Sequence, residues 1–379
     1  MKKPVLFLWS LLIGALLVLI VFYNPFADSE KKEKVLLIYT WMHTFDPETI
    51  KDFEKETGIT VHMDYYESDE ILEAKLLTGK SGYDIVMPSA TPYFGRQVLL
   101  KDKIFTPLDK SKLKNWGNLD ETILSLLEAL DEDNAYGIPF TWGVTGFAYD
   151  ANKIKKIFPY QKLPPDSLSF VYDEEQIKKL SKCGVTLLDY PQDLVESVLY
   201  YKGIQPNYGD FSQIETARKI LKKMRPHVKN FTANAGRMIN DLVNGEVCLM
   251  QTWSGEALRA QVEAKSSRKP VQLEFFIPKE YQGFWCDLFV IPRGAPHLEN
   301  AYKFLDFMMR GDIAARNIKY LLSPIANDAA LKHLPPSLRN NPLLYPKMVF
   351  ENFRINEVLT LSFERELTRM WTKTKVGQK

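Results

Sequence analysis

Two tryptophans and two acidic residues occur in short stretches whose spacing suits the capture of an organic cation. Residues 283–292 are rich in aromatic and β-branched residues between Gly and Pro, which predicts a strand. Trp285 and Asp287 would share one face of it, because side chains alternate along a strand. Trp253 and Glu256 occur together earlier in the chain. Indole faces attract cations and carboxylates pair with them, so these residues predict a pocket for a positively charged ligand.

A third tryptophan, Trp41, follows the first predicted strand. Other interpretations of these residues are structural: the tryptophans as core residues, Asp287 as a cap or structural pair, and Glu256 as a solvated residue at a helix start. A rival functional interpretation is an enzyme in which the two acids act as general acid and base. The chain has no nucleophile motif to accompany them, so we expect no enzymatic activity.

The segment 35–87 alternates in the order strand, helix, strand, helix, strand. Its first helix begins with Asp46 as a capping residue and Pro47 in the first turn. This order predicts a parallel sheet with helical crossovers. Ligands bind beyond the carboxyl ends of such strands, which is where Trp41 and Ser89 occur.

Three segments would carry the chain between two lobes: residues 135–149, 283–292 and 320–324. Gly143 and Gly146, in the first of these, could supply hinge freedom. We therefore predict an α/β fold of two lobes, each built on a mixed, mostly parallel sheet flanked by helices. The expected boundaries are 35–142 and 279–320 for lobe one, and 143–278 and 321–379 for lobe two.

The composition is that of an ordinary globular protein. The chain has 379 residues, 25% of them charged, and a net charge of +2 without a long basic run. This balance argues against nucleic acid as the main partner. The five histidines are scattered and no metal-ligand spacing or phosphate-binding loop occurs, so we predict neither a metal site nor a cofactor.

The N-terminal segment 1–30 differs from the rest. Lys2 and Lys3 precede an apolar run at 5–23, which as a helix would span roughly 28 Å at about 1.5 Å per residue, near the thickness of a bilayer core. Either an uncleaved membrane anchor or a cleaved secretory signal fits this pattern. Both would export the body of the chain, because basic residues at the start favour a cytoplasmic N-terminus.

An exported chain can pair its cysteines. Of the three cysteines, Cys183 and Cys248 are the candidates for a disulfide, and Cys286 is expected to be an inert buried thiol. Spacing alone does not establish the pair, and three separate buried thiols are the alternative.

Five stretches together resemble the polyamine-binding proteins of bacterial uptake systems, most closely the putrescine-binding branch. They are FEKETGITV (53–61), GYDIVMPSA (82–90), INDLVNG (239–245), TWSGE (252–256) and WCD (285–287). The resemblance covers nearly everything from residue 35 to residue 373. It implies a type II periplasmic binding protein fold, a periplasmic monomer, and delivery of the ligand to an ABC permease and its ATPase. It also supports the pair Cys183–Cys248.

The resemblance further implies a set of ligand-binding residues. They are Trp41, His43, Thr44, Ser89, Gln192, Trp253, Glu256, Trp285, Asp287 and Ser323. Several of these depart from the family pattern. The mild changes are Trp285 where Phe is common and Glu256 where Asp is common. His43 and Gln192 stand where the family often has an acid, and Thr44 and Ser323 stand where a Tyr is common. We therefore expect weakened affinity for putrescine or a different preferred organic cation. A tethered protein at the inner membrane that senses ligand, with the same fold and a changed ligand, is the alternative function.

Overall fold

The structure is a computed structural model that describes residues 34–99, 104–160, 162–163, 165–267, 270–281, 283–346, 354–355 and 358–377. The N-terminal segment for which we predicted an anchor or signal lies outside these residues. Within them, no helix combines the length and apolar character needed to cross a membrane.

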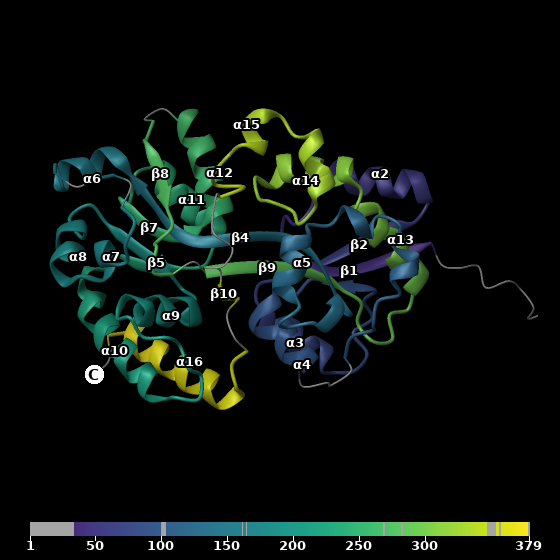
Figure 1. Cartoon of the computed structure of the whole chain (residues 1–379), viewed down its shortest axis with the longest axis horizontal. Coiled ribbons are helices and arrows are strands. Elements are labelled where there is room, and N and C mark those ends of the chain that lie inside the picture. Colours follow the sequence, from purple (N-terminus) through teal and green to yellow (C-terminus); the bar gives the residue numbers. More distant parts are fainter. Residues whose placement is uncertain are drawn as a thin grey trace, which may run out of the picture.

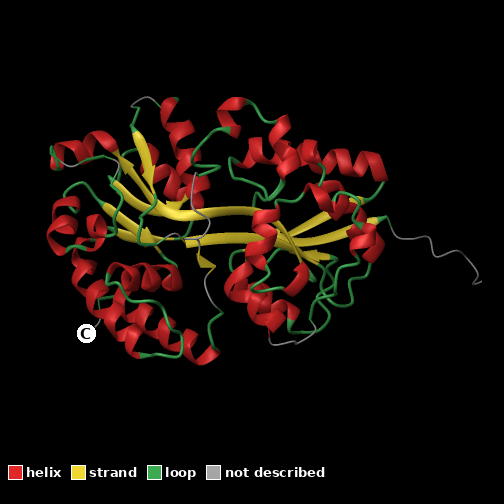
Figure 2. Cartoon of the chain, viewed as in Figure 1, coloured by secondary structure: helices red, strands yellow, loops and turns green. Residues whose placement is uncertain are grey.

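One hydrogen-bonded sheet runs through the described part of the chain, as Figure 2 shows in yellow. Its central path has the order β2-β1-β3-β9-β4-β7-β5-β6, with β10 added to β9 and β8 added to β4. The strands are β1 (Val35–Trp41), β2 (Thr60–Tyr66), β3 (Ile85–Val86), β4 (Gly137–Asp150), β5 (Val185–Leu188), β6 (Asn230–Thr232), β7 (Leu249–Trp253), β8 (Leu273–Phe276), β9 (Gly283–Val290) and β10 (Arg354–Ile355).

The predicted parallel parts are confirmed at both ends of this sheet. β1 pairs in parallel with β2 and β3 at one end, and β5 pairs in parallel with β6 and β7 at the other. Antiparallel pairing of β4 with β9 and β7, and of β3 with β9, joins the two ends. The long strands β4 and β9 therefore connect two groups of elements (Figure 1).

Helices surround the sheet at both ends (Figure 1). They are α2 (Pro47–Thr57), α3 (Asp69–Leu76), α4 (Gly95–Leu99), α5 (Glu121–Leu127), α6 (Ala151–Ile157), α7 (Ser169–Tyr172), α8 (Glu174–Leu180), α9 (Pro191–Tyr201), α10 (Ser212–Met224), α11 (Ala235–Val243), α12 (Ser254–Lys265), α13 (Leu298–Met308), α14 (Gly311–Leu321), α15 (Pro336–Arg339) and α16 (Leu361–Lys375).

Helix α2 forms as its sequence predicts. The Asp46 side chain accepts a hydrogen bond from the Glu48 N–H at 3.0 Å, and Pro47 occupies the first turn. Gly58 ends the helix with φ +67°, a left-handed conformation that glycine adopts at little cost. The helix then packs Phe53 into the core below β1 and returns the chain to β2, in parallel with β1.

The core lies in two sets of clusters on either side of the β4–β9 connection. Residues from β1, β3, α13 and α14 build one set, and residues from β5, α9, α10, α11 and α16 build the other. Residues 325–344, which we assigned to lobe two, pack with the first set. The exact lobe boundaries stay a prediction.

A residue larger than glycine does not fit at position 143 of β4. A Cβ atom there would lie 2.7 Å from Cε2 of Trp285 on the paired strand β9. The indole of Trp285 therefore lies against the backbone of β4, which any larger residue at 143 would prevent.

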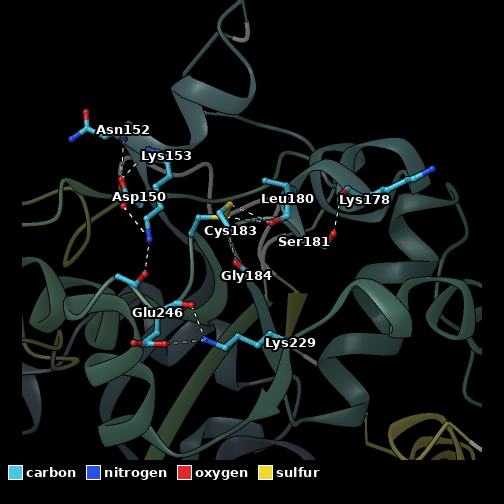
Figure 3. Close-up of a disulfide and its surroundings, with 12 residues drawn as sticks. Asp150, Asn152, Lys153, Lys178, Leu180, Ser181, Cys183, Gly184, Lys229 and Glu246 are labelled. Carbon is cyan, nitrogen blue, oxygen red and sulfur yellow. Dashed lines mark hydrogen bonds and ion pairs between the residues drawn. A yellow bond between two sulfur atoms is a disulfide. The ribbon is translucent and has the colours of Figure 1, made fainter.

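The predicted disulfide is confirmed. Cys183 and Cys248 are bonded, with their Cα atoms 5.4 Å apart, and Cys286 is a buried free thiol. Figure 3 shows the disulfide with Leu180 and Gly184 beside it. The bond joins the turn after α8 to the residue before β7. It therefore links two segments beside the second core, the one built by β5, α9, α10, α11 and α16.

Candidate functional site

Asp287 is the meeting point of three elements. It lies in β9 and forms an antiparallel bridge with Ser89, which follows β3. The Ser89 hydroxyl donates to Oδ1 of Asp287 at 3.2 Å, and the Thr141 hydroxyl, from β4, donates to Oδ2 at 3.1 Å. Ser89 precedes a short helical turn but makes no capping bond with its side chain. Its hydroxyl therefore serves the carboxylate and not the helix.

Burial raises the pKa of Asp287 to about 7, although hydrogen bonds from Thr141 and Ser89 work in the opposite direction. Glu256, in the first turn of α12, raises it further because the two negative charges repel each other. Burial also raises the pKa of Glu256, while the nearby Arg259 lowers it. The two predicted acids are therefore close enough to interact, and they favour a positive charge between or beside them.

Aromatic side chains lie on or next to the elements that carry these acids. Trp285 lies against Gly143 as described, and Trp253 pairs with Thr145 of β4 at the start of α12. The rings of Trp41 and Tyr66 are 4.4 Å apart between centroids. The indole N–H groups of Trp41 and Trp285 are buried without a hydrogen-bond partner among the described residues. A water molecule or a ligand acceptor would satisfy them.

A further acid, Asp69, borders this group. It is the first residue of α3, is 9% exposed, and accepts a hydrogen bond from the Ser89 N–H at 3.2 Å. Burial raises its pKa to about 8, and the charge of Asp287 contributes to that rise. Within the described residues, neither Asp69 nor Asp287 forms an ion pair with Lys or Arg. The described acids are also not grouped as metal ligands.

A family comparison decides what kind of protein carries this site. Residues 48–345 match the family described as bacterial extracellular solute-binding protein. The chain belongs to this family.

Individual relatives of this solute-binding protein have matching lengths. It is 37% identical over 346 residues to the putrescine-binding periplasmic protein SpuD of Pseudomonas aeruginosa, covering 91% of this chain and 93% of that one. It is also 37% identical over 349 residues to the putrescine-binding periplasmic protein PotF of Escherichia coli, covering 92% and 93%. The resemblance to the putrescine-binding branch is thus confirmed.

A solved structure supports the fold of the solute-binding protein. A putative spermidine/putrescine ABC transporter protein from Listeria monocytogenes superimposes with a TM-score of 0.77 at 28% identity, covering 90% of this chain and 99% of that one. The predicted type II periplasmic binding protein fold is confirmed.

The loop after β1 holds two predicted site residues of the solute-binding protein in different ways. His43 is exposed and has φ +60°, a left-handed conformation unusual for a non-glycine residue. Thr44 is buried, and its hydroxyl donates to the Trp41 carbonyl at 2.6 Å and lies 3.0 Å from the Thr40 hydroxyl. Thr44 therefore holds the turn that carries Trp41 and His43.

Ser323 lies at the start of α12 although it comes from the segment after α14. Its hydroxyl is so close to Gly255 that a Cβ atom at that position would overlap it. Arg259, one turn further along α12, donates to the backbone carbonyls of Tyr320 and Leu321 at 3.1 and 3.0 Å. The structure thus brings Ser323 next to the residue that precedes Glu256.

Gln192 and its neighbour Asp193 lie in different surroundings. The Gln192 amide donates to Oε1 of Glu196 at 3.0 Å, within the second core. Asp193 accepts from the Thr145 hydroxyl at 3.0 Å, two residues from Gly143 along β4. Burial chiefly raises the pKa of Tyr190, and the charges of Asp69, Asp193 and Asp287 add to that rise. Asp193 and Asp287 therefore both lie close enough to Tyr190 for their charges to act on it.

Sequence reasoning missed several residues of this group: Tyr66, Asp69, Thr141, Tyr190 and Asp193. Asp69 and Asp193 occupy first turns of helices, where acids commonly serve the helix dipole, so their position suggested no further role. Thr141 belongs to a strand that alternates as any core strand does. The signal that finds these residues is their burial beside one another, which only the folded chain reveals.

Proposed function

We propose that this solute-binding protein captures a polyamine or related small organic cation beside Asp287 and Glu256 and delivers it to an ABC permease with its ATPase. The observation that carries the proposal is a pair of interacting, partly buried acids with no Lys or Arg ion pair among the described residues. The relatives named for putrescine support the same ligand class.

The physical chemistry of amine binding favours these surroundings. An ammonium group that leaves water costs several kcal/mol unless carboxylates and hydrogen bonds compensate for it. Asp287 and Glu256 supply charge, and indole faces add about 0.5 to 2 kcal/mol each and cover an alkyl chain. Trp41, Trp253 and Trp285 are the proposed aromatic walls. We propose that the protein binds its ligand without turning it over.

The preferred ligand need not be putrescine. His43, Gln192 and Ser323 carry no negative charge at neutral pH, and a protonated His43 would repel a cation. We propose that the site binds putrescine more weakly than a site with acids at 43 and 192 would, or that another amine is preferred. His43, Thr44, Ser89, Gln192 and Ser323 remain proposed contacts of that ligand.

We place the protein in the periplasm as a monomer. An uncleaved segment 1–30 would attach it to the inner membrane. The ligand would bind between two lobes, and closure would bend the chain near Gly143, Pro278 and Ser323. The N-terminal apolar run favours one alternative: a tethered ligand sensor that signals to another protein. Loss of uptake on deletion, restored by the intact chain, would distinguish the carrier from the sensor.

Isothermal titration calorimetry with putrescine, cadaverine, spermidine and agmatine tests the ligand class. We expect at least one amine to bind, and Asp287→Asn to weaken it by roughly tenfold or more, because a charge-assisted interaction is lost. Asp166→Asn is the matched control, since the Asp166 side chain is 76% exposed. If none of the four amines binds, or if both variants behave alike, the proposal is wrong.

A further inference from the structure

Ser89 joins two acids that come from different elements. Its hydroxyl donates to Oδ1 of Asp287 in β9, and its backbone N–H donates to Oδ1 of Asp69 in α3, both at 3.2 Å. Asp69 is 9% exposed, whereas Glu70, the next residue of the same helix, is exposed. An acid that only served the helix dipole would gain nothing from burial beside a second acid.

A buried polar group without a partner lies within electrostatic reach of Asp69. Tyr93 is 1% exposed, and its hydroxyl has no hydrogen-bond partner among the described residues. Burial chiefly raises the pKa of Tyr93, the charges of Glu73 and Asp69 add to that rise, and Arg96 opposes it. A buried hydroxyl left unpaired costs free energy unless a water molecule or ligand group reaches it. One more polar partner, from water or from a ligand, would satisfy this hydroxyl.

The groups that face Asp69 are acidic or phenolic. Those whose charges interact with it are Tyr66, Glu70, Tyr93, Tyr190 and Asp287. They come from β2, the start of α3, the turn after Ser89, the start of α9, and β9. No Lys or Arg is among them, so in the described part of the chain the negative charge of Asp69 and Asp287 is left for a cation from outside.

We propose that Asp69 is a specificity-determining residue of the same cleft, forming with Asp287 and Ser89 a two-carboxylate cradle around a single ammonium group of the ligand. This inference rests on the proposed function. Asp69 would supply the cleft with negative charge that His43 and Gln192 do not carry. A primary ammonium, with three donors, suits two carboxylates better than a more substituted nitrogen with fewer donors.

Such a cradle couples ligand binding to proton release. At pH 7 the empty pair retains protons. Burial raises the pKa of Asp69 to about 8, with the charge of Asp287 adding to the rise, and burial raises that of Asp287 to about 7, with the charge of Glu256 adding to it. An incoming ammonium favours both carboxylates in their charged form, so the retained proton passes to the buffer. No bond to the ligand forms or breaks.

Calorimetry in two buffers of different ionisation enthalpy measures both effects with the amine that the wild-type chain binds. We expect Asp69→Asn, which keeps an oxygen for the Ser89 N–H, to weaken binding roughly tenfold or more and to reduce the number of protons released at pH 7. Asp166→Asn is the control, because it removes the charge of an acid whose side chain is 76% exposed, and it should change affinity less than threefold. Wild-type affinity and proton release in Asp69→Asn, or equal losses in both variants, would overturn the inference.

The outcomes separate this inference from the proposed function. Failure of the wild-type chain to bind any of the four amines overturns both, whereas normal binding by Asp69→Asn overturns only the cradle. Carboxyl NMR titration of the ligand-free chain is a second test that needs no folded Asp69 variant. We expect the titration midpoint of Asp69 to lie above pH 6 and to fall in Asp287→Asn. A midpoint near 4 that does not respond would contradict the cradle.

Discussion

Ser89 and Asp287 are separated by 198 positions in the chain, yet their side chains are joined by a hydrogen bond of 3.2 Å and their backbones pair in an antiparallel bridge. The bridge fixes the end of β3 to β9, and β9 in turn pairs with β4. The acid of the proposed site is therefore held by backbone pairing, which positions a side chain more rigidly than a loop does.

Removing the other donor to Asp287 should weaken amine binding. Thr141→Val keeps the shape of the side chain but deletes the hydroxyl that donates to Oδ2. Hydrogen bonds to charged groups contribute about 1.5–3 kcal/mol, so affinity should fall roughly tenfold or more. The fall should be larger at pH 6 than at pH 8, because the loss of this hydrogen bond raises the pKa of Asp287 further. Thr122→Val, at an exposed position, is the control, and an equal effect of both changes would refute the prediction.

A methyl group at position 143 should disturb the aromatic wall. Gly143→Ala places a Cβ atom in the space of the Trp285 indole, and overpacking of this kind typically costs about 1–3 kcal/mol. We expect a lower free energy of unfolding in urea and weaker amine binding. Gly117→Ala provides the comparison, because nothing lies within 4 Å of the added atom. Unchanged binding in Gly143→Ala would show that the position of Trp285 does not matter to the ligand.

The ligand-free protein should lose stability as the pH rises. The folded pKa values of Asp69, Asp287 and Glu196 are raised to about 8, 7 and 8, chiefly by burial, whereas unfolded carboxyls titrate near 4. Between those values the folded chain binds more protons than the unfolded chain, so stability present below about pH 4 is lost as the pH rises towards 8. Thermal unfolding at pH 5 and pH 8 should give the higher Tm at pH 5.

Two further measurements sharpen that prediction. Glu196→Gln removes one of the three buried acids and should make the dependence of Tm on pH shallower. A bound amine should restore stability at pH 8, because it compensates the charge of the acids beside it. A ligand-free Tm that rises from pH 5 to pH 8 would be incompatible with these raised pKa values.

Loss of the disulfide should destabilise the protein strongly. The bonded cysteines are separated by 65 positions, and closing a loop of that length contributes about 4 kcal/mol in the chain-entropy model. We expect the Cys183→Ser, Cys248→Ser double variant to unfold at lower urea concentration, and a reductant to shift the wild-type transition but not that of the variant. Identical transitions for the wild-type chain with and without reductant would argue against a stabilising bond.

Most of the fold could be predicted because its signals are local. The cap at Asp46, the stop at Gly58 and the alternation of strands and helices near the N-terminus each act within a few residues, and all appear in the structure. The sequence pattern did not indicate α6 or α14. Packing against the core, which the sequence pattern does not show, stabilises such short helices.

The site could be predicted only in part, for a related reason. Trp285 and Asp287 could be predicted from the sequence because an indole and a carboxylate share one face of a strand. Asp69 and Asp193 do not, because acids in a first helical turn have an ordinary structural explanation. Hinge freedom at Gly143 stays a prediction, and the structure adds a packing role beside Trp285 that the sequence did not indicate. In each case the deciding information is a contact between residues distant in sequence.

A crystal structure of the protein with the amine that binds it in calorimetry tests the central claim most directly. The account predicts density for the ligand beside β9, with an ammonium nitrogen within hydrogen-bond distance of an Asp287 oxygen and the alkyl chain against the indole of Trp285. An amine bound elsewhere, with Asp287 and Glu256 left in contact with water alone, would contradict it.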